Sequence, residues 1–507
     1  MADLNSASKP KPITRYTAMA LKAITDIKPS EVRLTLALFA TVFFLLMAYY
    51  IAKPVRDGWL SVSVISGLSA IEVKAFSGFM QSITLIMLIP YYTKLYDKLP
   101  RGKLLVYVNL FFMACFPVFW LIRPGLLGAI SPYCGVAFYI WIGIFGVAVV
   151  AQFWSFAADI YDEASGKRLF PLIALGATSG ALLGSLVTKN LIERLDISTY
   201  TLLLIAPVVL AISTFILWRI DKNEQASKKR SQSEDFVSKP DNLQNDMDDD
   251  TTEIEMDGDH QNSRSAWQII IGTRYITLIA LFIFMLNWVA TNGENILYAA
   301  IQDSIAKMDF SNLTPLETEK AVSQATAAFY SRINFWVSLV GTFLQAFIVS
   351  RLLKYGGLKA IMMLPPIVSL ASNGAIGAGG GTNVITTAYT AENSTNYSVA
   401  NTATQVVWLP VSKSALYKAK AAIDTTVFRS ADAIAAMTVL IGSRLIDIQL
   451  KGFIILNLCL IAIWIVIALL ILKERRAWDG VSPIGNVPMN EQAPEDRQSI
   501  ETVEGMS

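Results

Sequence analysis

The sequence predicts an all-α integral membrane protein with about twelve membrane-spanning helices. Of its 507 residues, 53% are hydrophobic and only 16% are charged, and the mean hydropathy is +0.46. Such a composition is unlike that of an ordinary soluble domain. Apolar runs of about twenty residues recur along the chain, and each is long enough to cross a hydrocarbon core of about 30 Å as a helix.

The apolar runs place the spans along the chain. In order, we predict helices over 33–52, 72–92, 104–122, 133–156, 169–189, 199–219, 275–296, 326–350, 359–378, 383–410, 427–447 and 451–473. The tenth of these is the most polar. The glycine-rich stretch "GAIGAGGGTN" (374–383) falls between the ninth and tenth spans and is predicted to be a turn.

Lysine and arginine residues set the orientation of these spans in the membrane. They gather before the first span, after the second, and in alternate connections from there to the C-terminus. Because short loops rich in Lys and Arg stay on the cytoplasmic side, both termini are predicted to be cytoplasmic. The first 30 residues are polar and lack the apolar segment of a signal peptide. A transit peptide is not visible either, which favours a multi-pass protein of a bacterial inner membrane.

Several classes of function are disfavoured by the residues present. The chain has one histidine, His260, in a polar segment, so His-based catalytic triads and His-ligated metals are not expected. Cys115, Cys134 and Cys459 fall in or next to spans and suggest neither a disulfide framework nor a metal site. No G-x-x-x-x-G-K-[ST] stretch is present. We predict no enzyme activity, no cofactor and no nucleic-acid partner.

A long polar stretch divides the chain into two halves. We expect a cytoplasmic N-terminal segment (1–32), a first six-helix bundle (33–220), an acidic linker (221–266), a second six-helix bundle (267–475) and a cytoplasmic tail (476–507). The linker is almost free of aromatic residues, so it is predicted to be disordered. It either tethers the bundles or binds a partner, and the tether is favoured.

The two halves resemble each other. "FLLMAYYIAKPVRDGWL" (44–60) aligns without a gap on "FIFMLNWVATNGENILY" (282–298). Two six-helix bundles in the same orientation are the arrangement of major-facilitator halves, which hold a site near mid-membrane between them. In this alignment Arg56 lies over Glu294 and Asp57 over Asn295. We expect Arg56 and Glu294 to approach each other across the cavity and to separate when an anionic ligand competes for the arginine.

The "KPVRD" stretch (53–57) is the first candidate site. Lys53 and Arg56 are three residues apart and share a helix face, and Pro54 is expected to bend or open the helix. An arginine fork beside a lysine suits an anion with several oxygens, such as phosphate. The alternative is that the span ends at Ala52, which leaves these charges at the membrane surface.

Further polar residues lie in the second half. The tenth span carries Glu392 and Asn396, and such polarity predicts a face that lines water or another helix. Arg429, near the start of the eleventh span, is favoured as a cavity cation, whereas Arg332 is left as an interfacial anchor. In the fifth span, small residues recur every fourth position at Gly176, Gly180 and Gly184, which predicts close packing against another helix.

The chain resembles the ATP/ADP antiporters, the nucleotide transporters of plastids and intracellular bacteria. The resemblance rests on "KPVRD" (53–57), "DEASGKRLFPLIALGA" (162–177), the Glu294 end of the seventh span, and "NYS…LP…YKAKAAIDTTVFR" (396–429). It implies exchange of ATP for ADP, or of other nucleotides, by alternating access. It also implies that Lys53 or Arg56, Glu163, Glu294 and Arg429 act in transport.

The predicted function is therefore nucleotide antiport by a monomer in a lipid bilayer. Two alternatives remain open from the residues alone. One is a major-facilitator-like carrier of another organic anion, coupled to protons through Glu294 or Glu392. The other is a membrane sensor or assembly protein whose acidic linker binds a partner.

Overall fold

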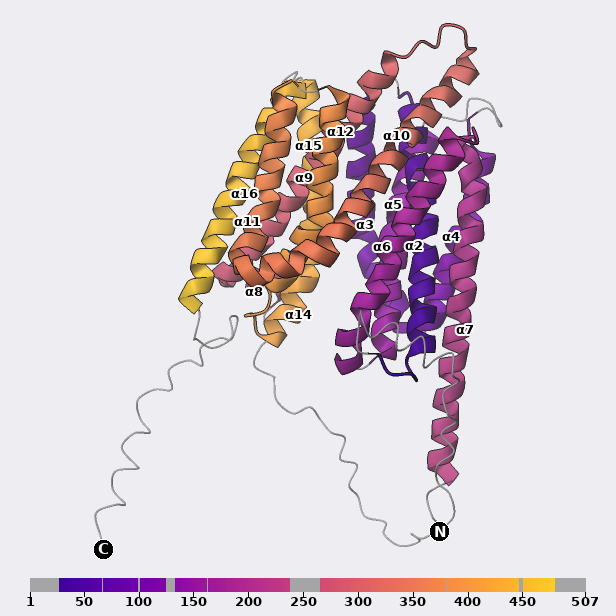
Figure 1. Ribbon diagram of the computed structural model, residues 1–507, viewed down its shortest axis with the longest axis vertical. Coiled ribbons are helices and arrows are strands. Elements are labelled where there is room, and N and C mark those ends of the chain that lie inside the picture. The colour runs from indigo at the N-terminus through magenta and orange to yellow at the C-terminus, as the bar shows by residue number, and fades with distance from the viewer. Residues whose placement is uncertain are drawn as a thin grey trace, which may run out of the picture.

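The first half of the protein is a bundle of six long helices. The computed structural model describes residues 27–65, 67–98, 101–124, 133–161, 163–237, 265–379, 381–445 and 450–478. In the first half these form α2 (Val32–Ser61), α3 (Ala70–Lys98), α4 (Arg101–Leu121), α5 (Tyr133–Ile160), α6 (Glu163–Glu193), the 3₁₀ turn η1 (Thr199–Thr201) and α7 (Leu202–Val237). Figure 1 shows them side by side in indigo to magenta.

The second half follows the same plan with more interruptions. It comprises α8 (Ala266–Gly272), α9 (Arg274–Ala306), α10 (Pro315–Phe343), η2 (Leu344–Ile348), α11 (Val349–Gly377), α12 (Thr382–Thr395), η3 (Asn396–Ala400), α13 (Asn401–Val406), α14 (Lys413–Ala422), η4 (Ile423–Val427), α15 (Phe428–Leu445) and α16 (Leu450–Trp478). The segments η2, η3 and η4 are π-helical. Three of the six passes in this half therefore contain or adjoin a π-helical turn.

The helices agree with about twelve membrane passes. Ten described helical stretches are long and apolar enough to cross a membrane, and one of them, Pro315–Gly377, is 63 residues long. At 1.5 Å per residue it would be about three times as long as the hydrocarbon core is thick, so it cannot be one pass. Gly357, with φ 60°, breaks the helix there, and Figure 1 shows the chain descending through α10 and rising through α11.

The remaining pass is the polar tenth span. It is formed by α12, η3 and α13. Its apolar content is too low for it to be among the ten apolar stretches. The predicted fold class, two six-helix bundles, is thus confirmed. The turn predicted over 374–383 is confirmed as well, because α11 ends at Gly377 and α12 begins at Thr382.

The start of the predicted linker is wrong. Helix α7 continues through the charged segment after residue 220 and ends at Val237. This segment contains several Lys, Arg, Gln and Glu residues, which favour helices even where no apolar face is present. The acidic part, residues 238–264, lies outside the described residues, so its predicted disorder stays a prediction.

The glycine face of α6 packs against α2, as the sequence predicts. A side-chain carbon placed on Gly176 or Gly184 would lie 2.6 Å from the backbone oxygen of Phe39 or Met47, and one on Gly180 would overlap the backbone oxygen of Phe43. These backbone oxygens cannot move without moving α2 itself. Only residues without a side chain therefore allow the two helices to approach this closely.

Replacing Gly180 with valine is expected to prevent the first bundle from forming. Overpacking of a well-packed interface typically costs about 1–3 kcal/mol, and here the clash is with backbone rather than with a movable side chain. We expect a large loss of folded, monodisperse protein in detergent, measured by size-exclusion chromatography. The matched control is Gly374→Ala on α11, where the added carbon meets nothing within 4 Å. Equal yields of the two variants would contradict the prediction.

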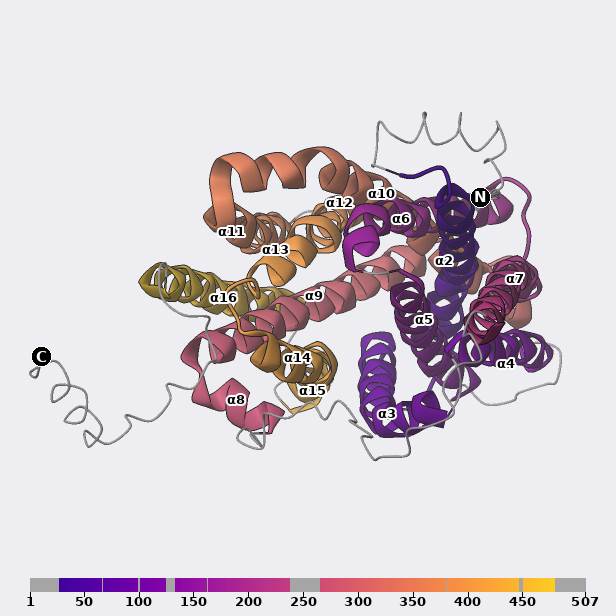
Figure 2. The same cartoon turned by 90° about the horizontal axis from the view of Figure 1, so that it is seen from below.

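We call the end of the molecule where α7 ends and α8 begins the linker side. Polar contacts join the two halves at the opposite end. Arg444 Nε on α15 donates to Glu72 Oε1 on α3 at 2.9 Å. Arg332 on α10 pairs with Glu193 on α6 at 2.7 Å. Figures 1 and 2 show α15 beside α3 and α10 beside α6. Arg332 therefore lies outside the cavity, as predicted, and ties the halves together.

Candidate functional site

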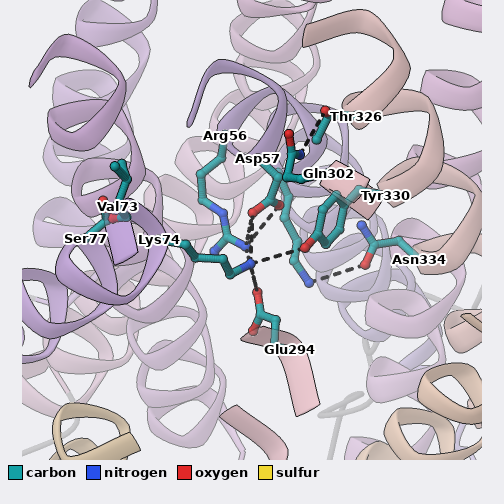
Figure 3. Close-up of polar contacts among 11 residues, drawn as sticks. Arg56, Asp57, Val73, Lys74, Ser77, Glu294, Gln302, Thr326, Tyr330 and Asn334 are labelled. Carbon is teal, nitrogen blue, oxygen red and sulfur yellow. Dashed lines mark hydrogen bonds and ion pairs between the residues drawn. The ribbon is translucent and has the colours of Figure 1, made fainter. Parts of the chain in front are cut away.

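Four charged side chains meet between the two halves, and we call them the charge cluster: Arg56, Asp57, Lys74 and Glu294. Arg56 Nη2 donates to both oxygens of Asp57 at 3.1 Å. Glu294 Oε1 accepts from Arg56 Nη2 at 3.3 Å and from Lys74 Nζ at 3.1 Å, and Lys74 Nζ lies 3.6 Å from Asp57 Oδ1. Figure 3 shows these groups pointing toward one another. Two cations and two carboxylates thus balance each other.

The cluster joins helices that are far apart in sequence. Arg56 and Asp57 come from α2 and Lys74 from α3, in the first half, while Glu294 comes from α9 in the second. The predicted approach of Arg56 to Glu294 is therefore confirmed. The alternative that the first span ends at Ala52 is wrong, because α2 continues to Ser61 and Asp57 is fully buried. The backbone is helical through Pro54, so no local opening is seen there.

The four members of the charge cluster differ in accessibility. The side chains of Arg56, Asp57 and Lys74 are 7%, 0% and 2% exposed, whereas that of Glu294 is 30% exposed. Aromatic rings enclose the two cations, with Tyr139 beside Arg56 and with Tyr298 and Tyr330 beside Lys74. Ring faces stabilise cations that have lost water. Glu294 is consequently the member that a solute reaches most readily.

Lys53 lies one turn from Arg56 and has a different environment. Its Nζ donates to Asn334 Oδ1 at 3.4 Å and lies 5.3 Å from the centre of the Tyr50 ring. Among the described residues no carboxylate is within ion-pair distance of it. Lys53 therefore contributes a positive charge that has no ion-pair partner among the described residues.

A second group of polar residues lies on the second half. Asp432 on α15 accepts from Asn287 Nδ2 at 2.7 Å and Thr291 Oγ1 at 2.8 Å, both on α9. Its other oxygen accepts from Arg429 at 3.0 Å. Asp432 thus holds the Arg429 guanidinium in place from one side.

Both groups line one cavity of about 680 Å³ between the halves. Lys53, Arg56, Lys74 and Glu294 lie along it, together with Arg429 and Asp432. The lining continues to Gln405 on α13 and to Asp424 on η4, the segment that follows α14. Helix α14 packs against α8, at the end of the molecule where α7 ends and α8 begins. Since the ion pairs described above tie the halves together at the opposite end, the cavity is a compartment on the linker side of the charge cluster.

The tenth span contributes to the cavity differently from the prediction. Asn396 lines it, along with Asn393 and Tyr397, so the expected polar face is present. Glu392 does not lie along the cavity: it is 3% exposed and accepts a hydrogen bond of 2.8 Å from Ser369 on α11. Glu392 therefore does not line this cavity, because its side chain is buried against α11, and its predicted role in translocation stays a prediction.

The other predicted residues have mixed outcomes. Asp57 contacts the cations but lies behind them, buried from the cavity. Glu163 is the first residue of α6, and its side chain lies outside the described part of the structure. The roles of Lys53, Arg56, Glu294 and Arg429 in transport stay predictions, although all four line the cavity.

Two residues of the site were missed from the sequence. Lys74 is a single lysine within an apolar run, and a charge in that position is a signal for an interior, functional residue. Asp432 follows Arg429 by three residues, the spacing of an ion pair on one helix face. The sequence contains both signals, but neither forms part of a longer pattern such as the internal repeat.

Comparison with known proteins supports the fold. A solved auto-inhibited peptide transporter of the POT family covers 88% of this chain and 97% of its own, with 13% identity and a TM-score of 0.56. A bacterial homologue of the iron transporter ferroportin covers 86% of this chain and 98% of its own, with 13% identity and a TM-score of 0.54. The fold of this chain is thus similar to the fold of these two solved proteins.

The sequence comparisons point to the same family as the predicted resemblance. The family model described as TLC ATP/ADP transporter matches residues 14–126. The chain is also 21% identical over 500 residues to ADP,ATP carrier protein 1 of Chlamydia pneumoniae, covering 87% of this chain and 91% of the relative. Both matches agree with the predicted resemblance: the chain is similar to ATP/ADP transporters, over most of its length in the second comparison.

Proposed function

We propose that the protein exchanges nucleotides of the ATP and ADP type across a bacterial inner membrane by alternating access. The observation that carries this proposal is the cavity between the halves, which is lined by cations from both of them: Lys53, Arg56 and Lys74 from the first and Arg429 from the second. ATP and ADP are multiply charged anions. A bound nucleotide would contact both halves at once, which is what a carrier that rocks around its substrate requires.

The cations have different tasks in this proposal. Lys53 is a point charge without a carboxylate partner among the described residues, so it can attract a phosphate without first breaking an ion pair. Arg56 offers a planar fork that matches two phosphate oxygens. Arg429, held by Asp432 at 3.0 Å, presents a cation of fixed orientation from the other half.

The arrangement also supports the inward orientation of the cavity. If the linker is cytoplasmic, as the Lys and Arg distribution predicts, the cavity faces the cytoplasm and the contacts of Arg444 with Glu72 and of Arg332 with Glu193 close the outer side. Exchange then requires these contacts to break while the cavity closes on the linker side.

The proposed exchange is tested by loading proteoliposomes with unlabelled ADP and adding labelled ATP outside. We expect uptake that depends on internal ADP and that is lost when the vesicles are loaded with buffer alone. Internal succinate in place of ADP distinguishes a carrier of other organic anions. Uptake that is independent of the internal solute would contradict exchange.

Replacing both Lys53 and Arg56 with glutamine is expected to abolish this uptake. The double variant removes the cation without an ion-pair partner among the described residues and the fork, which together are proposed to hold the phosphates. The control is Arg351→Gln, an exposed arginine on α11 outside the cavity, which should transport normally. Normal ATP uptake by the folded double variant would show that these cations do not bind substrate.

A further inference from the structure

The Glu294 carboxylate lies where an anionic ligand would be expected to bind. One of its oxygens accepts hydrogen bonds from Arg56 and Lys74 at 3.3 and 3.1 Å, and both cations line the cavity. Geometrically, this oxygen satisfies the two cations as one oxygen of a phosphate group would. Figure 3 shows Glu294 reaching the two cations from the side opposite to Asp57.

We propose that Glu294 is a resident anion in the phosphate subsite, and that a phosphorylated substrate binds by displacing it from Arg56 and Lys74. This inference rests on the proposed transport of nucleotides. Glu294 is suited to leave, because it is the most exposed member of the charge cluster, at 30%. Asp57, fully buried behind the cations, stays and keeps them partly neutralised.

The cluster also gives a phosphate an advantage over the carboxylate it displaces. Arg56 makes all its described hydrogen bonds through Nη2, and its Nε is buried without a partner among the described residues. An unsatisfied buried donor costs about 1–3 kcal/mol. A phosphate has three terminal oxygens and can satisfy Nε and Nη2 together, whereas Glu294 contacts Nη2 alone.

This exchange of anions makes Glu294 a residue that determines specificity. A ligand with no negative charge, such as a nucleoside, cannot replace the carboxylate, so it leaves Glu294 joined to the first half. A ligand with a phosphate releases Glu294 and with it the hydrogen bonds that join α9 to Arg56 on α2 and to Lys74 on α3. Substrate binding therefore removes two contacts between the halves.

Chemical rescue tests whether the site holds a separable anion. Glu294→Ala vacates the space of the carboxylate, and the full-length variant in detergent is titrated with sodium acetate against sodium chloride at equal ionic strength. We expect acetate to raise the thermal midpoint of Glu294→Ala while leaving the wild type unchanged. The control is Glu392→Ala, which removes a buried carboxyl that contacts no described cation. Rescue of both variants, or of neither, would overturn the proposal.

Binding of ADP to Glu294→Gln provides a second test that does not depend on the alanine variant folding. Because the glutamine is uncharged, the nucleotide no longer competes with a resident anion, and we expect ADP to bind about tenfold more tightly than to the wild type, or about 1.4 kcal/mol. Binding of adenosine should not change. Weaker ADP binding by Glu294→Gln would overturn the inference. If no variant binds ADP but acetate rescue is seen, the proposed function fails and the resident anion stands.

Discussion

Arg56→Gln is expected to be one of the most destabilising single substitutions in the charge cluster. Asp57 is fully buried and receives two hydrogen bonds of 3.1 Å from Arg56. Without the arginine, Lys74 at 3.6 Å is the one cation that remains beside it among the described residues. Removing one partner of a buried ion pair typically costs about 3–5 kcal/mol, because the other charge stays uncompensated. Glu294→Gln should cost much less, since Glu294 is 30% exposed and water can replace it.

The two neutralising substitutions are expected to be non-additive. Arg56→Gln leaves the cluster with one excess negative charge and Glu294→Gln with one excess positive charge, whereas the double variant leaves Lys74 and Asp57 balanced. The double variant should therefore be more stable than the sum of the single effects by about 0.5–3 kcal/mol. Thermal unfolding of all four proteins in one detergent measures this difference. Strict additivity would mean that the charges do not interact.

Exchanging the two charges is a less informative experiment. A glutamate at position 56 would lie beside Asp57, and an arginine at position 294 would lie beside Lys74. Both changes place like charges in contact, so the swapped protein carries two new repulsions. Neutral glutamine substitutions avoid this problem and are the appropriate probes.

Gly58→Ala is expected to shift the protein away from the conformation with the linker-side cavity. A carbon added to Gly58 on α2 would lie 2.6 Å from the backbone oxygen of Ser323 on α10. The two helices belong to different halves, so the clash is relieved if the halves separate at the end opposite the linker side. An overpacking cost of about 1–3 kcal/mol would change the ratio of the two conformations by roughly 5- to 150-fold.

Spin labels placed on the outer ends of the two halves measure this shift. Leu195 and Leu313 are exposed, follow α6 and precede α10, respectively, and belong to different halves. We expect the distance between labels at these positions to increase in Gly58→Ala. Gly341→Ala on α10 is the matched control, because its added carbon would lie 3.6 Å from the nearest atom, an ordinary contact. Unchanged distances in Gly58→Ala would show that the glycine does not set the conformation.

The sequence was sufficient to predict the parts of the site that follow from regular patterns. The internal repeat paired Arg56 with Glu294, and the structure brings them to 3.3 Å. The spacing of Gly176, Gly180 and Gly184 predicted the contact of α6 with another helix. Each of these predictions rests on a periodicity or an alignment, which can be recognised without knowing how distant helices pack.

The residues of the site that the sequence did not predict correctly share a physical reason. Lys74 reaches Glu294 only because α3 packs beside α9, a contact between halves that no local pattern encodes. Glu392 lies in a span whose polarity is real, but a helix has several faces and composition does not say which one turns to the cavity. Its hydrogen bond with Ser369 depends on the packing of α11 against α12. Helix packing, rather than helix formation, limited the prediction.

The π-helical turns η2, η3 and η4 imply that the two halves differ mechanically. All three lie in the second half, and two of them carry cavity residues, Asn396 on η3 and Asp424 on η4. The first half instead has a core of interlocked rings that includes Trp59, Phe138 and Phe145. π-helical turns inside α-helices are frequent at functional sites and are common positions of helix kinks. The first half is thus suited to move as a rigid body, while the second half can bend at its π-helical turns beside the cavity.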